Sequence, residues 1–116
     1  MSSADAQASS SSRLKQYLYI LRLVPRLHDP EAWTEADNAA LQRHFERLKM
    51  ATERGQVMLA GRTDEALDQT FGLVVFEAPT DASARAFMED DPTVAAGVMT
   101  AELHPYVVAL LRPGHP

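Results

Sequence analysis

The sequence contains no cysteine. Disulfide bonds, catalysis by a cysteine thiolate and metal sites with cysteine ligands are therefore excluded. Basic residues are also few, with 11 lysines and arginines against 16 aspartates and glutamates, and they form no block along the chain. The formal net charge of −5 would repel a nucleic-acid backbone, so we predict no nucleic-acid partner.

Long apolar runs are absent as well. No stretch approaches the roughly 20 residues that a membrane-spanning helix requires, and the N-terminal region lacks the pattern of a secretory signal. We therefore expect no membrane contact and, given the lack of cysteine, a cytoplasmic location. Residues 1–13 are rich in serine and alanine, which predicts a flexible tail before a single domain at residues 14–116.

Four segments have the aromatic and aliphatic composition of β-strands. They are residues 17–24, 56–60, 70–77 and 98–111. Pro105 interrupts the last segment, and because proline cannot donate to a sheet ladder, we expect an edge strand or a bulge there. A strand of this length could also extend beyond its own sheet to a second subunit.

Two segments between these strands have the pattern of helices. Apolar residues at steps of three and four predict a helix from near Thr34 to Gly55, and Thr34 with Asp37 resembles a capping box. A shorter helix is predicted to start at Thr80 and to end at Pro92. The order β-α-β-β-α-β predicts a ferredoxin-like α+β fold, a four-stranded antiparallel sheet with both helices on one face.

The predicted strands are apolar on both faces. Helices of the same chain can cover only one face of such a sheet. We therefore predict a homodimer in which two sheets face each other.

His44 lies on the apolar stripe of the first helix, and Asp91 lies at the end of the second. Each has an ordinary structural explanation, a partly buried histidine and an aspartate that caps a turn. The predicted topology places both helices in one layer, and a carboxylate that reaches an imidazole fixes its tautomer and strengthens it as a base. We therefore predict His44 and Asp91 as a catalytic acid-base pair.

Arg62 and His104 are candidates to line the mouth of a pocket and to hold an anionic or phenolic substrate. The alternatives are a solvated loop arginine and a histidine at an interface. His28 and His115 lie in a loop and in a proline-rich end. Because no close spacing of histidines and carboxylates supplies three or four metal ligands, we predict no metal and no cofactor.

An ordered set of short motifs resembles the YCII-related (YciI-like) family over roughly residues 17–112. The motifs are Arg43-His44, Leu48, Gly55, Leu59-Ala60-Gly61, Ala84-Arg85-Ala86-Phe87, Asp91-Pro92, Ala96-Gly97 and His104-Pro105-Tyr106. Members commonly carry Gly-Pro where this chain has Gly61-Arg62, and Arg-Pro with an aromatic residue where it has His104-Pro105-Tyr106. The substrate preference of the family is therefore not carried over.

The resemblance implies a dimeric α+β barrel of ferredoxin-like protomers, with a site centred on a histidine and an aspartate that match His44 and Asp91. The family has been linked to dehydrochlorination of a chlorinated hydroxyquinol, and similar folds host lyases, isomerases and monooxygenases of small aromatic rings. We expect a small cofactor-independent enzyme of the lyase or isomerase type that acts on a small polar or aromatic metabolite. The alternatives are a non-catalytic module that binds a metabolite in the same pocket, and a purely structural dimer without a cavity near His44.

Overall fold

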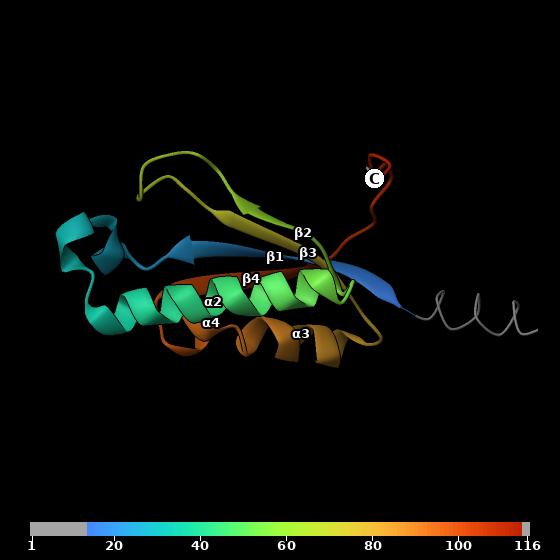
Figure 1. Cartoon of the computed structure of the whole chain (residues 1–116), viewed down its shortest axis with the longest axis horizontal. Coiled ribbons are helices and arrows are strands. Elements are labelled where there is room, and N and C mark those ends of the chain that lie inside the picture. Colours follow the sequence, from blue (N-terminus) through green and yellow to red (C-terminus); the bar gives the residue numbers. More distant parts are fainter. Residues whose placement is uncertain (1–13, 115–116) are drawn as a thin grey trace, which may run out of the picture.

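The computed structural model describes residues 14–114, which form one α+β domain (Figure 1). The tail predicted at residues 1–13 lies outside the described residues. Four strands form one sheet with the order β2-β3-β1-β4, and every neighbouring pair is antiparallel. The strands are β1 (Lys15–Leu23), β2 (Val57–Arg62), β3 (Gly72–Ala78) and β4 (Met99–Pro105). The predicted four-stranded antiparallel sheet is confirmed.

Helices cover one face of this sheet, the lower face in Figure 1. α2 (Glu35–Glu53) connects β1 to β2, while α3 (Asp81–Glu89) and the short α4 (Pro92–Ala95) connect β3 to β4. Two 3-10 turns, η1 (Pro25–His28) and η2 (Pro30–Ala32), lead from β1 to α2. The predicted ferredoxin-like order is therefore confirmed, with α4 as an additional helical turn.

The start of α2 is fixed by the predicted capping box. Thr34 Oγ1 accepts from the Asp37 N–H at 3.1 Å, and the Asp37 carboxylate accepts from the Thr34 N–H at 2.9 Å. The Arg26 guanidinium donates two further hydrogen bonds to Asp37, at 2.9 and 3.0 Å, and so ties η1 to the helix. Beyond the end of α2, Gly55 adopts a φ of 86°, which favours glycine. These contacts set the rotation of α2 and hence the side of the helix on which His44 lies.

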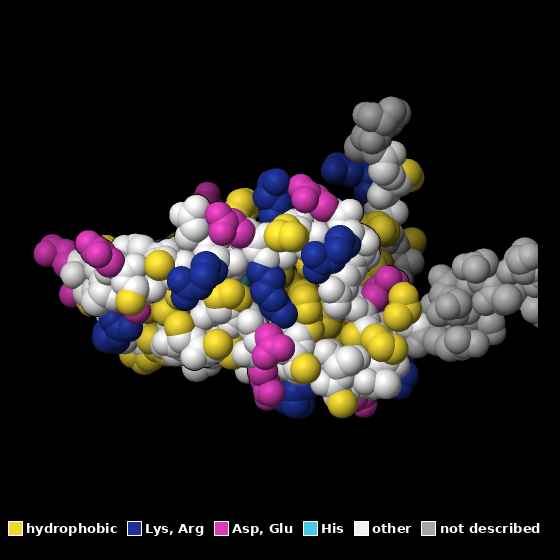
Figure 2. Space-filling view, turned by 60° about the horizontal axis from the view of Figure 1, so that its bottom comes forward, with side chains coloured by type: hydrophobic (Ala, Val, Ile, Leu, Met, Phe, Trp, Pro, Cys, Tyr) yellow, Lys and Arg dark blue, Asp and Glu magenta, His cyan; other side chains and the backbone are white. Residues whose placement is uncertain are grey.

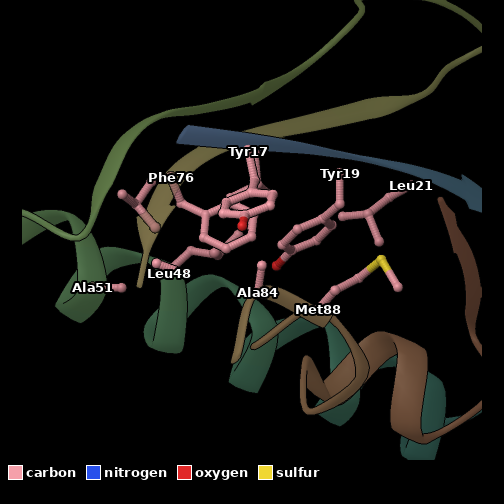
Figure 3. Packing of buried hydrophobic residues seen from close by; sticks show 11 residues of the cluster. Tyr17, Tyr19, Leu21, Leu48, Ala51, Phe76, Ala84 and Met88 are labelled. Atoms are coloured by element: carbon pink, nitrogen blue, oxygen red, sulfur yellow. The ribbon is translucent and has the colours of Figure 1, made fainter. Parts of the chain in front are cut away.

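Alternate side chains of β1 point into the space between the sheet and the helices. Tyr17, Tyr19 and Leu21 are buried there, and the ring of Phe76 on β3 lies 5.7 Å from that of Tyr17 and 5.6 Å from that of Tyr19 (Figure 3). The helices contribute Leu48, Ala51, Ala84 and Met88 to the same core. This core joins β1 to the layer that carries both His44 and Asp91.

The other face of the sheet, here called the open face, carries no helix of the described residues (Figure 1). Cross-strand neighbours point to the same side of a sheet, so the register identifies its members. They are Gln16, Leu18, Ile20 and Arg22 on β1, Leu59 and Gly61 on β2, Leu73, Val75 and Glu77 on β3, and Thr100, Glu102 and His104 on β4. The open face thus combines a group of apolar side chains on β1, β2 and β3 with polar side chains on β1, β3 and β4.

Two differences from the sequence prediction involve prolines, and the other strand ends differ by one or two residues. β4 ends at Pro105 and not at residue 111, because Pro105 has no N–H and its partner Tyr17 lies near the beginning of β1. Pro92 ends a helix, as predicted, but it also occupies the first turn of α4, a position that suits proline because the N–H there has no partner within the helix. No helix within residues 14–114 has the length and the apolar character needed to cross a membrane.

Candidate active site

The structure brings His44 and Asp91 into contact although 47 positions separate them in the sequence. His44 Nδ1 lies 2.7 Å from Asp91 Oδ1 and 2.9 Å from Asp91 Oδ2. The imidazole is 14% exposed and the carboxylate is 0% exposed. The contact is therefore a hydrogen-bonded pair in which only the histidine reaches solvent.

Asp91 also caps α4, so the structural explanation considered from the sequence and the pairing with His44 hold together. Its Oδ1 accepts from the Thr93 N–H at 3.0 Å and from the Thr93 hydroxyl at 2.8 Å, and its Oδ2 accepts from the Tyr19 hydroxyl at 2.7 Å. Both oxygens of this buried carboxylate are thus hydrogen-bonded. The backbone of the α3–α4 corner holds Asp91 in place, and a core tyrosine contacts it from the sheet.

These contacts keep Asp91 ionised. Burial alone would raise the pKa of Asp91, but the hydrogen bonds from His44, Tyr19 and Thr93 and the charge of the imidazole outweigh it and lower the pKa below its ordinary value. Burial, followed by the charge of Asp91 and the hydrogen bond to it, raises the pKa of Tyr19 far above its ordinary value. Tyr19 therefore remains a donor to Asp91.

The ionised carboxylate determines which nitrogen of His44 carries the proton. A carboxylate only accepts hydrogen bonds, so Nδ1 must be the donor. The neutral ring then has its lone pair on Nε2, which has no hydrogen-bond partner within residues 14–114. An imidazole arranged in this way can take a proton at Nε2 and return it.

His44 lines a groove of about 1170 Å³ between α2 and the β1, β2 and β3 part of the sheet. Its walls are mainly apolar and include Leu41, Phe45 and Leu48 from α2, and Leu21, Phe71 and Val74 from the sheet side. Asp91 is not among the residues that line the groove. The groove is slightly larger than the roughly 300–1,000 Å³ of typical ligand pockets, and its position beside His44 counts against a purely structural dimer.

Arg62 also lines the groove, at the end of β2. In the register of the sheet, Arg62 pairs with Gly72, and Gly72 pairs with Leu21. Cross-strand partners point to the same side of a sheet, and Leu21 points toward the helices. Arg62 is therefore on the face of the sheet that carries the groove. Its guanidinium donates to the carbonyl of Thr63 at 3.3 Å and pairs with no carboxylate within residues 14–114. Arg62 is therefore placed to receive an anionic group.

His104 occupies a different part of the molecule. It lies on the open face beside Leu18, and its Nε2 is 2.7 Å from Glu102 Oε2. It does not line the groove. The structure thus brings His44 and Asp91 into contact and places Arg62 in the lining of the same groove as His44, whereas His104 lies on the other face of the sheet.

Two residues of this site were not identified from the sequence. Tyr19 was assigned only to an apolar strand, because its inward position resembles that of any core aromatic residue. Thr93 follows Asp91-Pro92, and a capping aspartate before a proline is a recognisable helix start that would have indicated a bond to the N–H of residue 93. The hydroxyl bonds of both residues to Asp91 depend on tertiary contacts.

Charged side chains of both signs are scattered over the helical side of the molecule, with small apolar areas between them, as Figure 2 shows.

Arg47 differs from these surface charges because it points inward from α2, one turn after His44. Its Nη2 donates to the carbonyl of Phe87 at 2.9 Å, its Cζ lies 4.3 Å from the centre of the Phe87 ring, and its Nη1 is buried without a partner among residues 14–114. Its charge partly opposes the rise in the pKa of Tyr19.

The fold agrees with comparisons to known proteins. The family model described as the YCII-related domain matches residues 20–103, and the chain belongs to this family. Among solved structures, it is similar to 5-chloro-2-hydroxyhydroquinone dehydrochlorinase (TftG) from Burkholderia phenoliruptrix AC1100, in complex with 2,5-dihydroxybenzoquinone. The TM-score is 0.54 at 15% identity, over 79% of this chain and 93% of that one, a likeness of fold. The comparison with curated proteins gave no match.

Proposed function

We propose that this protein is a small cofactor-independent enzyme of the lyase or isomerase type, in which His44 is the general acid and base and Asp91 orients it. The observation that supports this proposal is the 2.7 Å contact between His44 Nδ1 and a fully buried Asp91, with the histidine beside a groove. The pair has a donor and an acceptor in fixed roles, as general acid-base catalysis requires.

In the proposed reaction, His44 Nε2 removes a proton from a substrate held in the groove. The electron pair of the broken bond then forms a new double bond. In a lyase, a leaving group on the adjacent carbon departs with its bonding electrons, and in an isomerase the proton returns from Nε2 to another atom of the substrate. Asp91 stays ionised and stabilises the imidazolium that exists between these steps. General acid-base catalysis of this kind contributes about 10²- to 10⁴-fold in rate.

The walls of the groove favour a small ring-shaped or otherwise apolar substrate that carries an acidic group. Apolar side chains surround most of the groove, and Arg62 at its edge would hold a carboxylate or a phenolate. The neighbouring enzyme TftG acts on a chlorinated hydroxyhydroquinone and was solved with a quinone bound, which supports phenols and quinones as the first compounds to test.

A thermal-shift screen against small phenols, quinones and aromatic acids tests the proposal. A ligand at 100 times its Kd stabilises the native protein by about 2.7 kcal/mol, which gives a readily measured shift. We expect His44→Ala and Arg62→Ala to reduce the shift, whereas the control His28→Ala should keep it, because His28 lies in η1 and outside the groove. Equal shifts in all four proteins would contradict the assignment of the groove.

Turnover separates the enzyme from the alternative, a module that binds a metabolite in the same groove without changing it. The enzyme requires the basic Nε2 of His44, whereas a binding module requires only the walls. Compounds that bind in the screen should be incubated with the protein and analysed for product. Binding without product for every such compound, with His44→Ala binding equally well, would favour the binding module.

We also propose that the protein is a homodimer. The open face exposes apolar side chains, and Leu59 is 58% exposed. After β4, Val107, Leu110 and Leu111 are 81%, 94% and 68% exposed in a segment that extends above the open face in Figure 1. Such surfaces are typical of interfaces. Light scattering at micromolar concentration should give twice the monomer mass of 12.8 kDa, and a monomer would contradict the proposal.

A further inference from the structure

Tyr19 is a buried polar residue that takes no direct part in the reaction proposed above. It is 0% exposed, and it does not line the groove, so it cannot touch a substrate there. Figure 3 shows its ring extending from β1 toward the helices, with the hydroxyl oxygen at the far end. That oxygen donates to Asp91 Oδ2 at 2.7 Å. A phenylalanine would fill the same space in the core, so the hydroxyl calls for an explanation beyond packing.

The two oxygens of Asp91 are held unequally. Thr93 supplies two donors to Oδ1, at 3.0 and 2.8 Å. Apart from His44 itself, Tyr19 is the donor that holds Oδ2 within residues 14–114. The hydroxyl of Tyr19 therefore fixes the rotation of the carboxylate, which places both oxygens within 2.9 Å of His44 Nδ1.

We propose that Tyr19 is a positioning residue: its hydroxyl, acting through Asp91, holds His44 in the tautomer that leaves Nε2 free on the side of the groove. This proposal rests on the proposed role of His44. Without the hydroxyl, Asp91 Oδ2 keeps only His44 as a donor, and the carboxylate can turn about its last side-chain bond. The preference for a proton on Nδ1 then weakens, and Nε2 is unprotonated in a smaller share of the molecules.

Tyr17 provides a matched control on the same strand. Its ring is buried beside Phe76, as that of Tyr19 is, and its hydroxyl donates to Asp81 at 2.6 Å. Asp81 forms no hydrogen bond or ion pair with His44 among residues 14–114. Tyr17→Phe therefore removes a buried tyrosine hydroxyl and its bond to a carboxylate without changing Asp91.

The tautomer of His44 can be read from the two ring-nitrogen signals in ¹H–¹⁵N spectra of the labelled protein at neutral pH, assigned with His44→Gln. In the wild type we expect well-separated signals, with Nδ1 protonated. In Tyr19→Phe we expect this separation to narrow, and in Tyr17→Phe we expect it to stay unchanged. Equal spectra for Tyr19→Phe and the wild type would overturn the proposal, and so would equal narrowing in both variants.

A second measurement applies if Tyr19→Phe does not fold. The chain has three tyrosines, so in a Tyr17→Phe/Tyr106→Phe background Tyr19 is the single one left. Fluorotyrosine incorporated there makes the hydroxyl a stronger donor. The His44 nitrogen signals should then shift relative to those of the unfluorinated protein, and unchanged signals would overturn the proposal.

The same spectra distinguish a failure of the role proposed for His44 from a failure of the role proposed for Tyr19. If wild-type His44 carries its proton on Nε2, the role proposed for His44 as a base fails, and the role of Tyr19 fails with it. If wild-type His44 has the expected tautomer but Tyr19→Phe leaves it unchanged, only the role of Tyr19 fails. With a substrate from the screen, Tyr19→Phe should lower kcat about tenfold with little change in KM, as expected when an interaction serves the transition state.

Discussion

Residues 14–114 contain two histidine–carboxylate pairs with the same separation of 2.7 Å, on opposite faces of one sheet. His44 and Asp91 lie on the helical side, where their side chains are 14% and 0% exposed. His104 and Glu102 lie on the open face, where theirs are 46% and 64% exposed. In the second pair water competes for both partners, so the bond holds neither of them firmly.

The two pairs differ in how firmly the carboxylate is held, although their distances are equal. Asp91 has additional donors on both oxygens, from Tyr19 and Thr93. Because the Asp91 carboxylate is fully buried, water does not compete for these oxygens. Glu102 has no donor besides His104 among residues 14–114. A buried carboxylate that is fully hydrogen-bonded has one orientation, and it transmits that orientation to the histidine.

The largest difference between the pairs should appear in turnover. Asp91→Asn should lower kcat by about 10²-fold or more, because the amide neither fixes the tautomer of His44 nor stabilises the imidazolium. Glu102→Gln removes the corresponding charge on the open face and should leave kcat within about twofold. Steady-state rates on a substrate from the screen would measure both, and similar losses in the two variants would contradict a special role of the buried pair.

Acid stability should also depend on Asp91. Its pKa in the folded protein is below the ordinary value, so its stabilising effect is present above about pH 4, the ordinary range of aspartate, and is lost as the pH falls through the folded pKa. Asp37 also loses its stabilising effect in acid, because hydrogen bonds from Arg26 and Thr34 lower its pKa. This loss is the same in the wild type and in Asp91→Asn, so it cancels when the two proteins are compared.

Urea unfolding of the wild type and Asp91→Asn between pH 7 and pH 3 measures this effect. The wild type should lose more stability on acidification, and the two proteins should differ in slope by at most about 1.4 kcal/mol per pH unit, the limit for one proton. Parallel curves would mean that Asp91 is not held as an ionised group.

The sequence allowed the sheet and the starts of α2 and α3 to be predicted, because each depends on local signals. The aromatic and aliphatic composition of β1 and the Thr34–Asp37 capping box are examples. The pairing of His44 with Asp91 was a hypothesis from the predicted topology and the family resemblance, since 47 positions separate the two residues. The sequence did not reveal the bond from Tyr19 to Asp91, since 72 positions separate these residues and an inward tyrosine looks like any core residue. It also could not assign His104 to a face, because that depends on its register with Leu18.

A third hydrogen bond to a carboxylate, from Tyr17 to Asp81, is intermediate in burial between the two histidine pairs. Tyr17 is buried, but its acceptor Asp81 is exposed at the start of α3. The hydrogen bond to Asp81, followed by burial, raises the pKa of Tyr17 to about 12. The neutral phenol therefore contributes stability that is complete below pH 10, the ordinary value, and is lost as the pH rises toward 12.

Tyr17→Phe should accordingly lower stability at neutral pH by about 1 kcal/mol, the typical value of a hydrogen bond. The difference from the wild type should shrink between pH 10 and pH 12. Urea midpoints at pH 8, 10 and 11.5 would show this trend, and a constant difference would mean that the hydroxyl of Tyr17 is not the group that titrates.

The smallest effect is expected on the open face. His104→Gln should change the free energy of unfolding of the protomer by less than about 0.5 kcal/mol, because an exposed ion pair contributes little and most surface substitutions have small effects. It should also leave the ligand-induced thermal shift unchanged, whereas Arg62→Ala should reduce it, since Arg62 lines the groove and His104 does not. If His104→Gln reduced the shift as much as Arg62→Ala does, His104 would hold the substrate, as first predicted, and a second subunit would have to bring it to the groove. The variant therefore tests whether each protomer provides a complete site.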